Sequence, residues 1–379
     1  MSSPAIATPL KQTALNATHR KLKAKMVDFG GWDMPVEYSG LMAEHLAVRT
    51  GVGLFDVSHM GEIQFRGPNA LAAVQSITMN DASKLKDGQA QYSALLTPEG
   101  TFVDDILVHR LGENDYLLVV NAGTKDKDYA WIRKHVGATH GIHCSDYSSY
   151  YSQIAVQGPR ALETVQKLTK VDLGGIKNYW FTWGQVAGIY NTLIARTGYS
   201  GEDGFELYIP SDVATTEKLW DALMEAGAEF GMLPCGLGAR NTLRLEAGMP
   251  LYGHEISDET TPIEAGLERW LKLDKPADFL GRAALHALKD AGGPARKLVG
   301  LEMVERGIAR DGYPVLNEAG ETIGVVTSGS PAPYLKTNIA YAYVPVAVAE
   351  SKEDVWVQVR ANRVRAKQVG TPFYKRVKG

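Results

Sequence analysis

The segment 92-YSALLTPEGTFVDDILVHRLGENDYLLVVN-121 decides the fold of the first part of the chain. Three apolar, strand-like runs are separated by TPEG and GENDY, which carry proline, glycine and asparagine where tight turns favour them. Because both connections are short, the three strands should pair as an antiparallel meander. Two adjacent carboxylates, Asp104 and Asp105, interrupt the middle run, where an unpaired buried charge is costly.

The first turn sets the pairing of the first two strands. A four-residue turn over 97–100 places Leu96 opposite Thr101. Counting back along both strands then brings Tyr92 opposite Asp105. Directly opposed residues share one face of a sheet, with Cβ atoms about 5 Å apart.

The second turn sets the pairing of the last two strands. If it spans 111–115, with Arg110 opposite Tyr116, then Asn121 also lies opposite Asp105. A third polar side chain therefore reaches the same face as the second aspartate of the pair.

The meander thus predicts one polar row, Tyr92–Asp105–Asn121, across a sheet that is mostly apolar. Asp104 should face the other way and serve structure, because successive strand residues point to opposite faces. A one-residue bulge would swap the faces and bring Ser93 and Asp104 together instead. The row could equally be a satisfied buried polar network without chemistry, since such networks occur in plain structure.

Composition is that of an ordinary soluble globular protein. The 379 residues suffice for two or three domains, and 45% are apolar and 22% charged. The net charge of -3 argues against nucleic acid as the main partner. Two cysteines, Cys144 and Cys235, are too few for a disulfide framework or a cysteine zinc site. They predict two small buried thiols in a reducing compartment.

Apolar runs and the N-terminus bear on location. No run reaches the roughly 20 apolar residues of a membrane span, so we expect no membrane association. The first 26 residues lack acids and carry several bases, which raises the question of a transit peptide. Their second half, however, runs directly into VDFGGWDMP, which reads as domain. We therefore expect only the first eight or so residues to be a loose tail, and a bacterial, cytoplasmic protein.

Periodicity divides the chain into two regions. The stretch GLFDVSHMGEIQFRG at 53–67 predicts a strand that opens a sheet, and the Gly/Pro-containing stretch 274–297 predicts a linker. Amphipathic helices are predicted over three ranges: 41–50, 126–137 and 215–231. Short strands after the linker are typical of a small β-barrel or sandwich. We therefore predict an α+β fold, with two interleaved subdomains in 1–280 and a C-terminal β-barrel domain in 281–379.

Charged residues in two further motifs could bind a ligand. Glu206 enters an apolar strand after the turn of ARTGYSGEDGFELYIP, and a carboxylate there could accept two parallel N–H bonds from a planar heterocycle. Arg240 and Arg244 lie on one face of a predicted helix, where one should pair with Glu246 or another acid. Arginine is also the favoured clamp for ligand carboxylates.

Other motifs carry weaker signals. Met60 is ordinarily a core residue, and its neighbour His59 is more often structural than a ligand. No second ligand stands at metal spacing from His59, so we predict no metal site. Arg310 lies in IARDGYPV, which taken alone is a surface loop. Neither the dinucleotide fingerprint nor the P-loop pattern occurs in the sequence.

Taken together and in order, the motifs resemble the aminomethyltransferase, or T-protein, family of the glycine cleavage system. The resemblance runs from about residue 10 to the C-terminal PFYKRVKG. It rests on AKMVDFGGWDMPVEY, GVGLFDVSHMGE, FVDDILV, VVNAG, RTGYSGEDGFEL, GLGARNTLRLEAG, LYGHEI, IARDGYPV and GVVTSGSPAP. Each motif alone is weak, and the ordered set is specific.

This resemblance implies a three-domain cloverleaf around a central channel that binds tetrahydrofolate. The first two domains are interleaved and the last is a small β-barrel. The implied reaction takes an aminomethyl group carried on the dihydrolipoyl arm of the lipoylated H-protein. It yields ammonia, 5,10-methylenetetrahydrofolate and the reduced carrier in glycine catabolism. Tetrahydrofolate is then a co-substrate, and neither a metal nor a flavin is required.

Family motifs also imply site residues. Asp105 matches the essential aspartate of the family. Seven further residues match folate-binding positions of the family: Met60, Tyr92, Asn121, Tyr199, Glu206, Arg240 and Arg310. The resemblance implies that Tyr199 and Glu206 contact the pterin. It implies that the two arginines lie near the folate and the channel mouth. The chain departs from the commonest pattern at Arg269, where many relatives place a tryptophan that here stands one position later.

Related proteins offer other functions on the same fold. Dimethylglycine and sarcosine dehydrogenases carry an N-terminal flavin domain with a dinucleotide fingerprint, which this sequence lacks. Folate-dependent demethylases act on methylated sulfur compounds, and an ammonia-release assay separates them from this family. The folate-binding protein of iron–sulfur assembly carries a K-G-C-x-x-G-Q motif that does not occur here. Fold alone does not choose among these functions.

Overall fold

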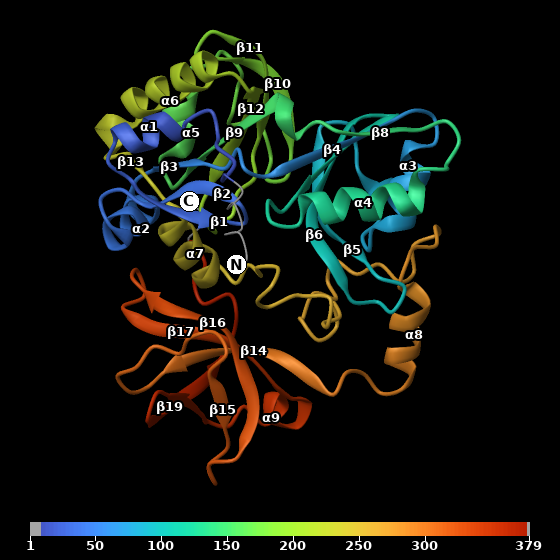
Figure 1. Ribbon diagram of the computed structural model, residues 1–379, viewed down its shortest axis with the longest axis vertical. Coiled ribbons are helices and arrows are strands. Elements are labelled where there is room, and N and C mark those ends of the chain that lie inside the picture. Colours follow the sequence, from blue (N-terminus) through green and yellow to red (C-terminus); the bar gives the residue numbers. More distant parts are fainter. Residues whose placement is uncertain (1–8, 377–379) are drawn as a thin grey trace, which may run out of the picture.

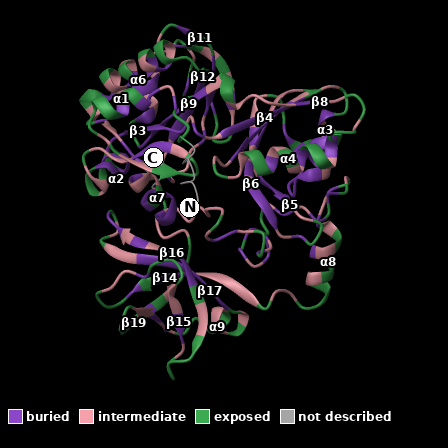
Figure 2. Ribbon diagram, viewed as in Figure 1, coloured by how far each residue is buried: buried purple, intermediate pink, exposed green. Residues whose placement is uncertain are grey.

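Three lobes surround the centre of the molecule in the computed structural model, which describes residues 9–376 (Figure 1). The loose tail expected for the first eight residues lies outside the described residues. Each lobe has its own buried interior, and exposed positions concentrate on the outer helices and loops (Figure 2). Within residues 9–376, no helix is long and apolar enough to cross a membrane. The predicted α+β cloverleaf with a C-terminal barrel is confirmed.

The first domain is built on a six-stranded sheet in the order β10-β11-β12-β9-β3-β13. Its strands are β3 (Gly53–Asp56), β9 (Tyr151–Gln157), β10 (Phe181–Val186), β11 (Ile189–Ala195), β12 (Gly204–Pro210) and β13 (Leu233–Pro234). A separate hairpin consists of β1 (Lys25–Phe29) and β2 (Trp32–Glu37). The sheet mixes chain segments from before and after the second domain, so the two domains are interleaved.

Five helices belong to this domain: α1 (Asn16–Lys21), α2 (Leu41–Thr50), α5 (Ala161–Gln166), α6 (Val213–Gly227) and α7 (Leu237–Glu246). Strand alternation separates two cores, because Leu54 packs with α5 and α6 whereas Phe55 packs with α2 and α7. The predicted helices 41–50 and 215–231 correspond to α2 and α6. Cys235 is buried between α2 and α7, as expected for a small apolar thiol.

The second domain is inserted between β3 and β9. Its sheet has the order β5-β6-β7-β4-β8, with β4 (Gly61–Arg66), β5 (Gln89–Leu96), β6 (Phe102–Gly112), β7 (Asp115–Val120) and β8 (His143–Asp146). Helices α3 (Ala70–Ile77) and α4 (Lys125–Val136) bury one face of this sheet. The other face packs toward the first domain through Leu107 and Val119.

The single strand predicted over 53–67 is wrong. The stretch forms β3 and β4, which belong to different sheets and are separated by residues 57–60. Asp56 ends β3, and its carboxylate accepts from the backbone N–H of Ser58 at 2.9 Å, which turns the chain. The alternating apolar pattern continues through Met60, although the chain passes there from the first domain to the second.

The C-terminal region begins with α8 (Arg282–Asp290), inside the linker predicted over 274–297. A closed barrel follows, in the order β14-β17-β16-β15-β18-β19. Its elements are β14 (Arg296–Met303), β15 (Pro314–Leu316), β16 (Thr322–Ala332), β17 (Thr337–Pro345), α9 (Val346–Ser351), β18 (Val355–Val359) and β19 (Asn362–Val369). Arg244 of α7 joins the barrel to the first domain by donating to Glu255 at 2.5 Å and to Ser328 at 2.8 Å.

The register of the first hairpin differs from the prediction. The loop has three residues, 98–100, closed by the pair Thr97–Thr101, and Gly100 takes a φ of +83°. Leu96 therefore pairs with Phe102, and a further one-residue shift follows between Leu95 and Leu96. The two offsets add to two residues, so the side-chain faces are conserved.

Asp105 is consequently opposite Ala94, and Tyr92 is opposite Leu107, two residues along the same face. The second predicted register is confirmed, because Arg110 pairs with Tyr116, but the predicted turn 111–115 is wrong: after a register shift Gly112 still pairs with Asp115. Strand β7 ends at Val120, so Asn121 lies one residue beyond the sheet, beside Asp105. The predicted polar row forms as a diagonal rather than as a line of opposed residues.

Candidate functional site

A cavity of about 750 Å³ lies where the domains meet. Its walls come from the meander of the second domain, from β12 and α7 of the first, and from residues 247–270. Leu298 and Tyr341 of the barrel and Pro372 of the C-terminal segment also line it. Seven of the eight site residues expected from the sequence line this cavity: Met60, Tyr92, Asp105, Asn121, Tyr199, Glu206 and Arg240.

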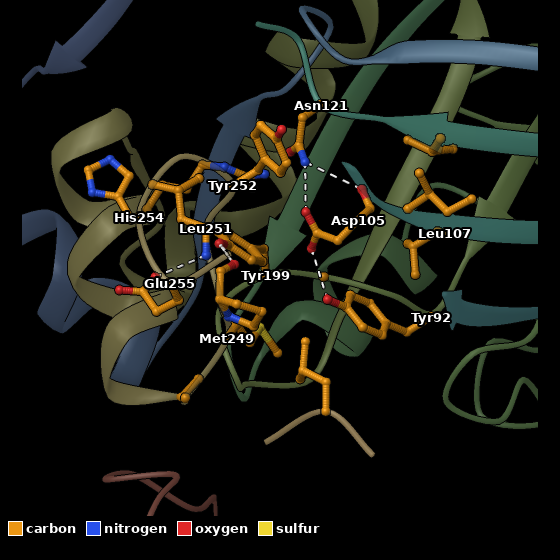
Figure 3. Close-up of a pocket in the computed structure, with 18 of the residues that line it drawn as sticks. Tyr92, Asp105, Leu107, Asn121, Tyr199, Met249, Leu251, Tyr252, His254 and Glu255 are labelled. Atoms are coloured by element: carbon orange, nitrogen blue, oxygen red, sulfur yellow. Dashed lines mark hydrogen bonds between the residues drawn. The ribbon is translucent and has the colours of Figure 1, made fainter. Parts of the chain in front are cut away.

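Asp105 is held from both sides of its carboxylate. Tyr92 donates its hydroxyl hydrogen to Oδ2 at 3.1 Å, and the Asn121 amide donates to Oδ1 at 2.8 Å. The three side chains point toward one another at the cavity wall (Figure 3). Two donors fix the rotamer of Asp105, so a reacting group in the cavity meets a carboxylate of defined position.

Burial and a neighbouring charge raise the pKa of Asp105 to about 7. Desolvation contributes most, because neighbouring side chains cover much of this half-buried group, and the adjacent Asp104 carboxylate adds to it. The hydrogen bonds from Asn121 and Tyr92 stabilise the ionised form and oppose the increase in pKa. A carboxylate with such a pKa exchanges a proton near neutral pH, which is the range that acid–base chemistry requires.

Asp104 occupies the opposite face, as predicted, but it is linked to Asp105. The amide of Asn121 donates to Asp104 Oδ1 at 2.9 Å as well as to Asp105 Oδ1. Asp104 also accepts from the backbone N–H of Asn121 at 3.1 Å and from the Thr124 hydroxyl at 2.8 Å. Asp104 thus has a backbone partner on the face away from the cavity, as expected of a structural residue, and one amide connects it to Asp105.

Glu206 lies in the middle of β12, between Ala195 and Ala155 of the neighbouring strands. Its side chain is buried at the cavity wall and accepts a short hydrogen bond from the Thr197 hydroxyl. Burial raises the pKa of Glu206, whereas the Thr197 hydrogen bond and the Arg240 charge lower it. The other lone pairs of this carboxylate remain available to N–H donors in the cavity.

Arg240 and Tyr199 form one unit beside Glu206. The guanidinium of Arg240 stacks over the ring of Tyr199, 4.6 Å from its centroid, and Tyr199 donates its hydroxyl hydrogen to the Pro250 carbonyl. Within residues 9–376, Arg240 forms no ion pair, and burial lowers its pKa. Arg244 instead pairs with Glu255, and Glu246 pairs with Arg49. Arg240 is thus a half-buried cation that lines the cavity.

Arg310 and Met60 are the two remaining site residues that the sequence predicted. Arg310 is exposed on the barrel and does not line the cavity, although its neighbour Asp311 contacts the cavity residue His254 at 3.1 Å. Met60 both lines the cavity and packs with apolar residues of the two domains. Met60 is therefore a packed residue that also lines the cavity, and its contact with a ligand stays a prediction.

Several lining residues were not predicted. Gln153 has a buried Oε1 without a hydrogen-bond partner among the described residues, and Tyr179 adopts a φ of +62° at the cavity. An uncommon backbone conformation at a site residue can carry function. His254 belongs to LYGHEI, which stood out as a motif but gave no role, because residues 247–270 form little regular structure from which to argue a register.

Comparison with known proteins agrees with this architecture. A family described as "GCVT N-terminal domain" matches residues 15–275, and "Glycine cleavage T-protein C-terminal barrel domain" matches residues 296–375. The chain belongs to the glycine cleavage T-protein family. The T-protein barrel match covers β14 to β19.

Similar T-protein family members span the whole chain. An aminomethyltransferase of Acidobacterium capsulatum is 66% identical over 369 residues, which cover 97% of each protein. One of Koribacter versatilis is 59% identical over 379 residues, covering 99% of each. The crystal structure of the glycine cleavage system aminomethyltransferase T from Bartonella henselae is 33% identical. It superimposes with a TM-score of 0.89 over 97% of this chain and 98% of that one.

Proposed function

We propose that the chain is the aminomethyltransferase of a glycine cleavage system, with tetrahydrofolate as co-substrate and a lipoylated H-protein as partner. The observation that carries the proposal is Asp105, a half-buried carboxylate oriented by Tyr92 and Asn121 in a cavity between the domains. The bacterial relatives support a cytoplasmic location and a role in glycine catabolism. We also divide the chain functionally into residues 1–280 and the barrel region 281–379.

The cavity suits tetrahydrofolate in size and in chemistry. Its volume of about 750 Å³ lies within the range of sites that enclose a small ligand. The pterin ring presents several N–H donors, and Glu206 and the unpartnered Oε1 of Gln153 are acceptors on one wall. Arg240 and the Tyr199 ring offer a cation and a flat surface beside them. Asp105 lies on the wall contributed by the second domain.

The reaction needs a one-carbon unit to leave sulfur and nitrogen and to bond to two folate nitrogens. The S–CH₂ and CH₂–NH₂ bonds break, two C–N bonds form, and the two folate N–H protons pass to the thiolate and the departing amine. Asp105 hydrogen-bonds the attacking nitrogen and stabilises the cationic carbon as charge develops. Tyr92 and Asn121 keep this carboxylate in place, and positioning of two reactants is itself a large contribution.

The direct test is the reaction itself. Aminomethylated H-protein should give ammonia and 5,10-methylenetetrahydrofolate together when tetrahydrofolate is present, and far less ammonia when it is omitted. Equal ammonia release with and without folate, or no transfer at all, would refute the function. Methyl transfer from a methylated sulfur compound, in place of H-protein, would favour a demethylase.

Activity should rise with pH through the pKa of Asp105, because the ionised carboxylate is the active form. We expect Tyr92→Phe to move this acid limb to higher pH by roughly half to one unit, since it removes a hydrogen bond that stabilises the ionised form. The pH dependence of kcat/KM for tetrahydrofolate measures the shift. A limb that stays in place or moves to lower pH contradicts the assignment of the limb to Asp105.

A further inference from the structure

Two buried carboxyl groups lie on the side of strand β6 away from Asp105. Asp128, in the first turn of α4, and Asp104, on β6, both have no exposed surface. The backbone N–H of Asp128 donates to the Thr124 carbonyl at 2.8 Å, which fixes the start of the helix. Thr124 brings the two aspartates together, because its carbonyl holds Asp128 and its hydroxyl donates to Asp104 Oδ2 at 2.8 Å, and the Asp104 carboxyl group is the neighbouring charge that acts on Asp128.

Donors are distributed unequally over this pair. Asp104 accepts three hydrogen bonds, from the backbone and side chain of Asn121 and from Thr124. Neither carboxyl oxygen of Asp128 has a partner of hydrogen-bond geometry among residues 9–376, and the neighbouring Thr124 hydroxyl, which has a single hydrogen, donates to Asp104 at 2.8 Å. The Lys127 ammonium is 3.9 Å from Asp128 Oδ1 and donates elsewhere, to the Val103 carbonyl and to the Tyr252 hydroxyl. Asp104 is therefore equipped to be a carboxylate, and Asp128 is not.

Two buried carboxylates in contact cannot both be ionised at reasonable cost, so one retains a proton. The count of donors places that proton on Asp128, where it can be donated to Asp104. Burial and the neighbouring Asp104 charge raise the pKa of Asp128 to about 10, in agreement with this placement. Lys127 lowers it only in part, because its ammonium is partly exposed.

We propose that Asp128 is a positioning residue for Asp105. Its protonated carboxyl group donates to Asp104, Asp104 orients the Asn121 amide, and the amide orients the carboxylate that faces the cavity. The catalytic role of this series of hydrogen bonds rests on the function proposed above. The protonation of Asp128 and the sequence of hydrogen bonds do not depend on that function, because they follow from contacts within the protein without substrate.

The Asn121 amide connects Asp104 to Asp105, so a change at Asp128 can reach the carboxylate in the cavity. Its –NH₂ group has two hydrogens, and the close acceptors are Asp104 Oδ1 at 2.9 Å and Asp105 Oδ1 at 2.8 Å. A proton on Asp128 keeps the pair with Asp104 at a single negative charge. A second charge there would raise the pKa of Asp105 further and disfavour its ionised form. The charged or titratable groups that face the pair are Lys127, Tyr252 and Asp105.

Two substitutions of Asp128 distinguish a protonated carboxyl group that donates a hydrogen bond from an ionised carboxylate. Asp128→Asn keeps a donor toward Asp104 without a charge, so we expect it to retain at least about half of kcat, with the acid limb of the pH profile unmoved. Asp128→Ala removes the donor, so kcat should fall about tenfold while the KM for tetrahydrofolate stays within about twofold. Asp126→Asn, on an exposed neighbour in α4, is the matched control and should leave kcat unchanged.

An ionised Asp128 predicts the opposite result. Both variants would then remove a negative charge near Asp105 and move the acid limb to lower pH, by about one unit for a charge this close. That shift, or an Asn variant as impaired as the Ala variant, overturns the proposal.

An infrared pH titration tests the protonation without any turnover. The wild-type protein should show a protonated-carboxyl C=O band at pH 7 that Asp128→Asn removes and Asp126→Asn retains. Absence of a band that depends on Asp128 overturns the proposal, even if the Ala variant does not fold. If the wild-type protein shows the band but no folate-dependent ammonia release, the proposed function fails and the protonation stands.

Discussion

Asp105→Asn should lower kcat for folate-dependent ammonia release by roughly 10²- to 10³-fold, the range found when a positioned acid–base group is removed. The asparagine side chain has nearly the same shape and can keep one hydrogen bond with Tyr92 or Asn121. It cannot carry the negative charge that stabilises the cationic carbon. Steady-state assays with aminomethylated H-protein and calorimetric binding of tetrahydrofolate would measure the two effects separately, and we expect the affinity to change little.

Protein stability distinguishes a catalytic loss from misfolding. The folded-state pKa of Asp105 is about 7, above its ordinary value, so the folded state binds the extra proton between about pH 4 and 7. The free energy of unfolding contributed by this group therefore falls as pH rises through that window. Asp105→Asn removes the cost and should melt no lower than wild type at pH 8. Asp221→Asn, on an exposed position of α6, is the control. Near-normal turnover in Asp105→Asn would remove Asp105 from the mechanism.

The meander explains how far sequence alone reached into the site. Turn chemistry predicted the antiparallel order and the shared face of Tyr92, Asp105 and Asn121. It did not predict the three-residue loop that Gly100 permits or the further shift between Leu95 and Leu96. The shared face survived only because the two offsets add to two residues, the period of a strand.

Features that depend on tertiary contacts could not be predicted from the sequence. The apolar alternation of 53–67 has the period of a strand throughout, yet the chain leaves one sheet and enters another at Met60. Residues 247–270 contribute a large part of the cavity but have too little regular periodicity to place in advance. For Asp128 the sequence predicted only a place in an amphipathic helix. Its neighbour Asp104 belongs to strand β6, and the helix pattern gives no information about that contact.

Family resemblance and local physics contributed different parts of the site. Strand position and charge alone marked Asp105 and Glu206 as unusual, and arginine chemistry marked Arg240. Tyr199 came from the resemblance only, and the structure gives it a physical reason, because its ring supports the Arg240 guanidinium. Arg310 also came from the resemblance, and its exposed position leaves any contact with a ligand a prediction.

Glu206→Gln should weaken tetrahydrofolate binding by roughly 10- to 100-fold, which corresponds to the loss of charged hydrogen bonds worth about 1.5–3 kcal/mol. Thr197 donates to one oxygen of Glu206 and would retain the amide oxygen of the glutamine. The amide –NH₂ would then face the cavity, where it meets the N–H donors of the pterin and repels them. We expect kcat at saturating folate to stay within a few-fold of wild type, because Asp105 is untouched.

The same substitution should not weaken the fold, which makes the binding loss interpretable. Burial raises the pKa of Glu206, so the folded protein holds its charge at a cost that a neutral glutamine removes. Thermal denaturation should therefore give an equal or higher Tm than wild type, whereas titration calorimetry should give the weaker Kd. Glu225→Gln, on the exposed side of α6, controls for the loss of a surface charge. An unchanged Kd in Glu206→Gln would exclude Glu206 as the acceptor for the pterin, and the unpartnered Gln153 Oε1 would become the candidate acceptor on that wall.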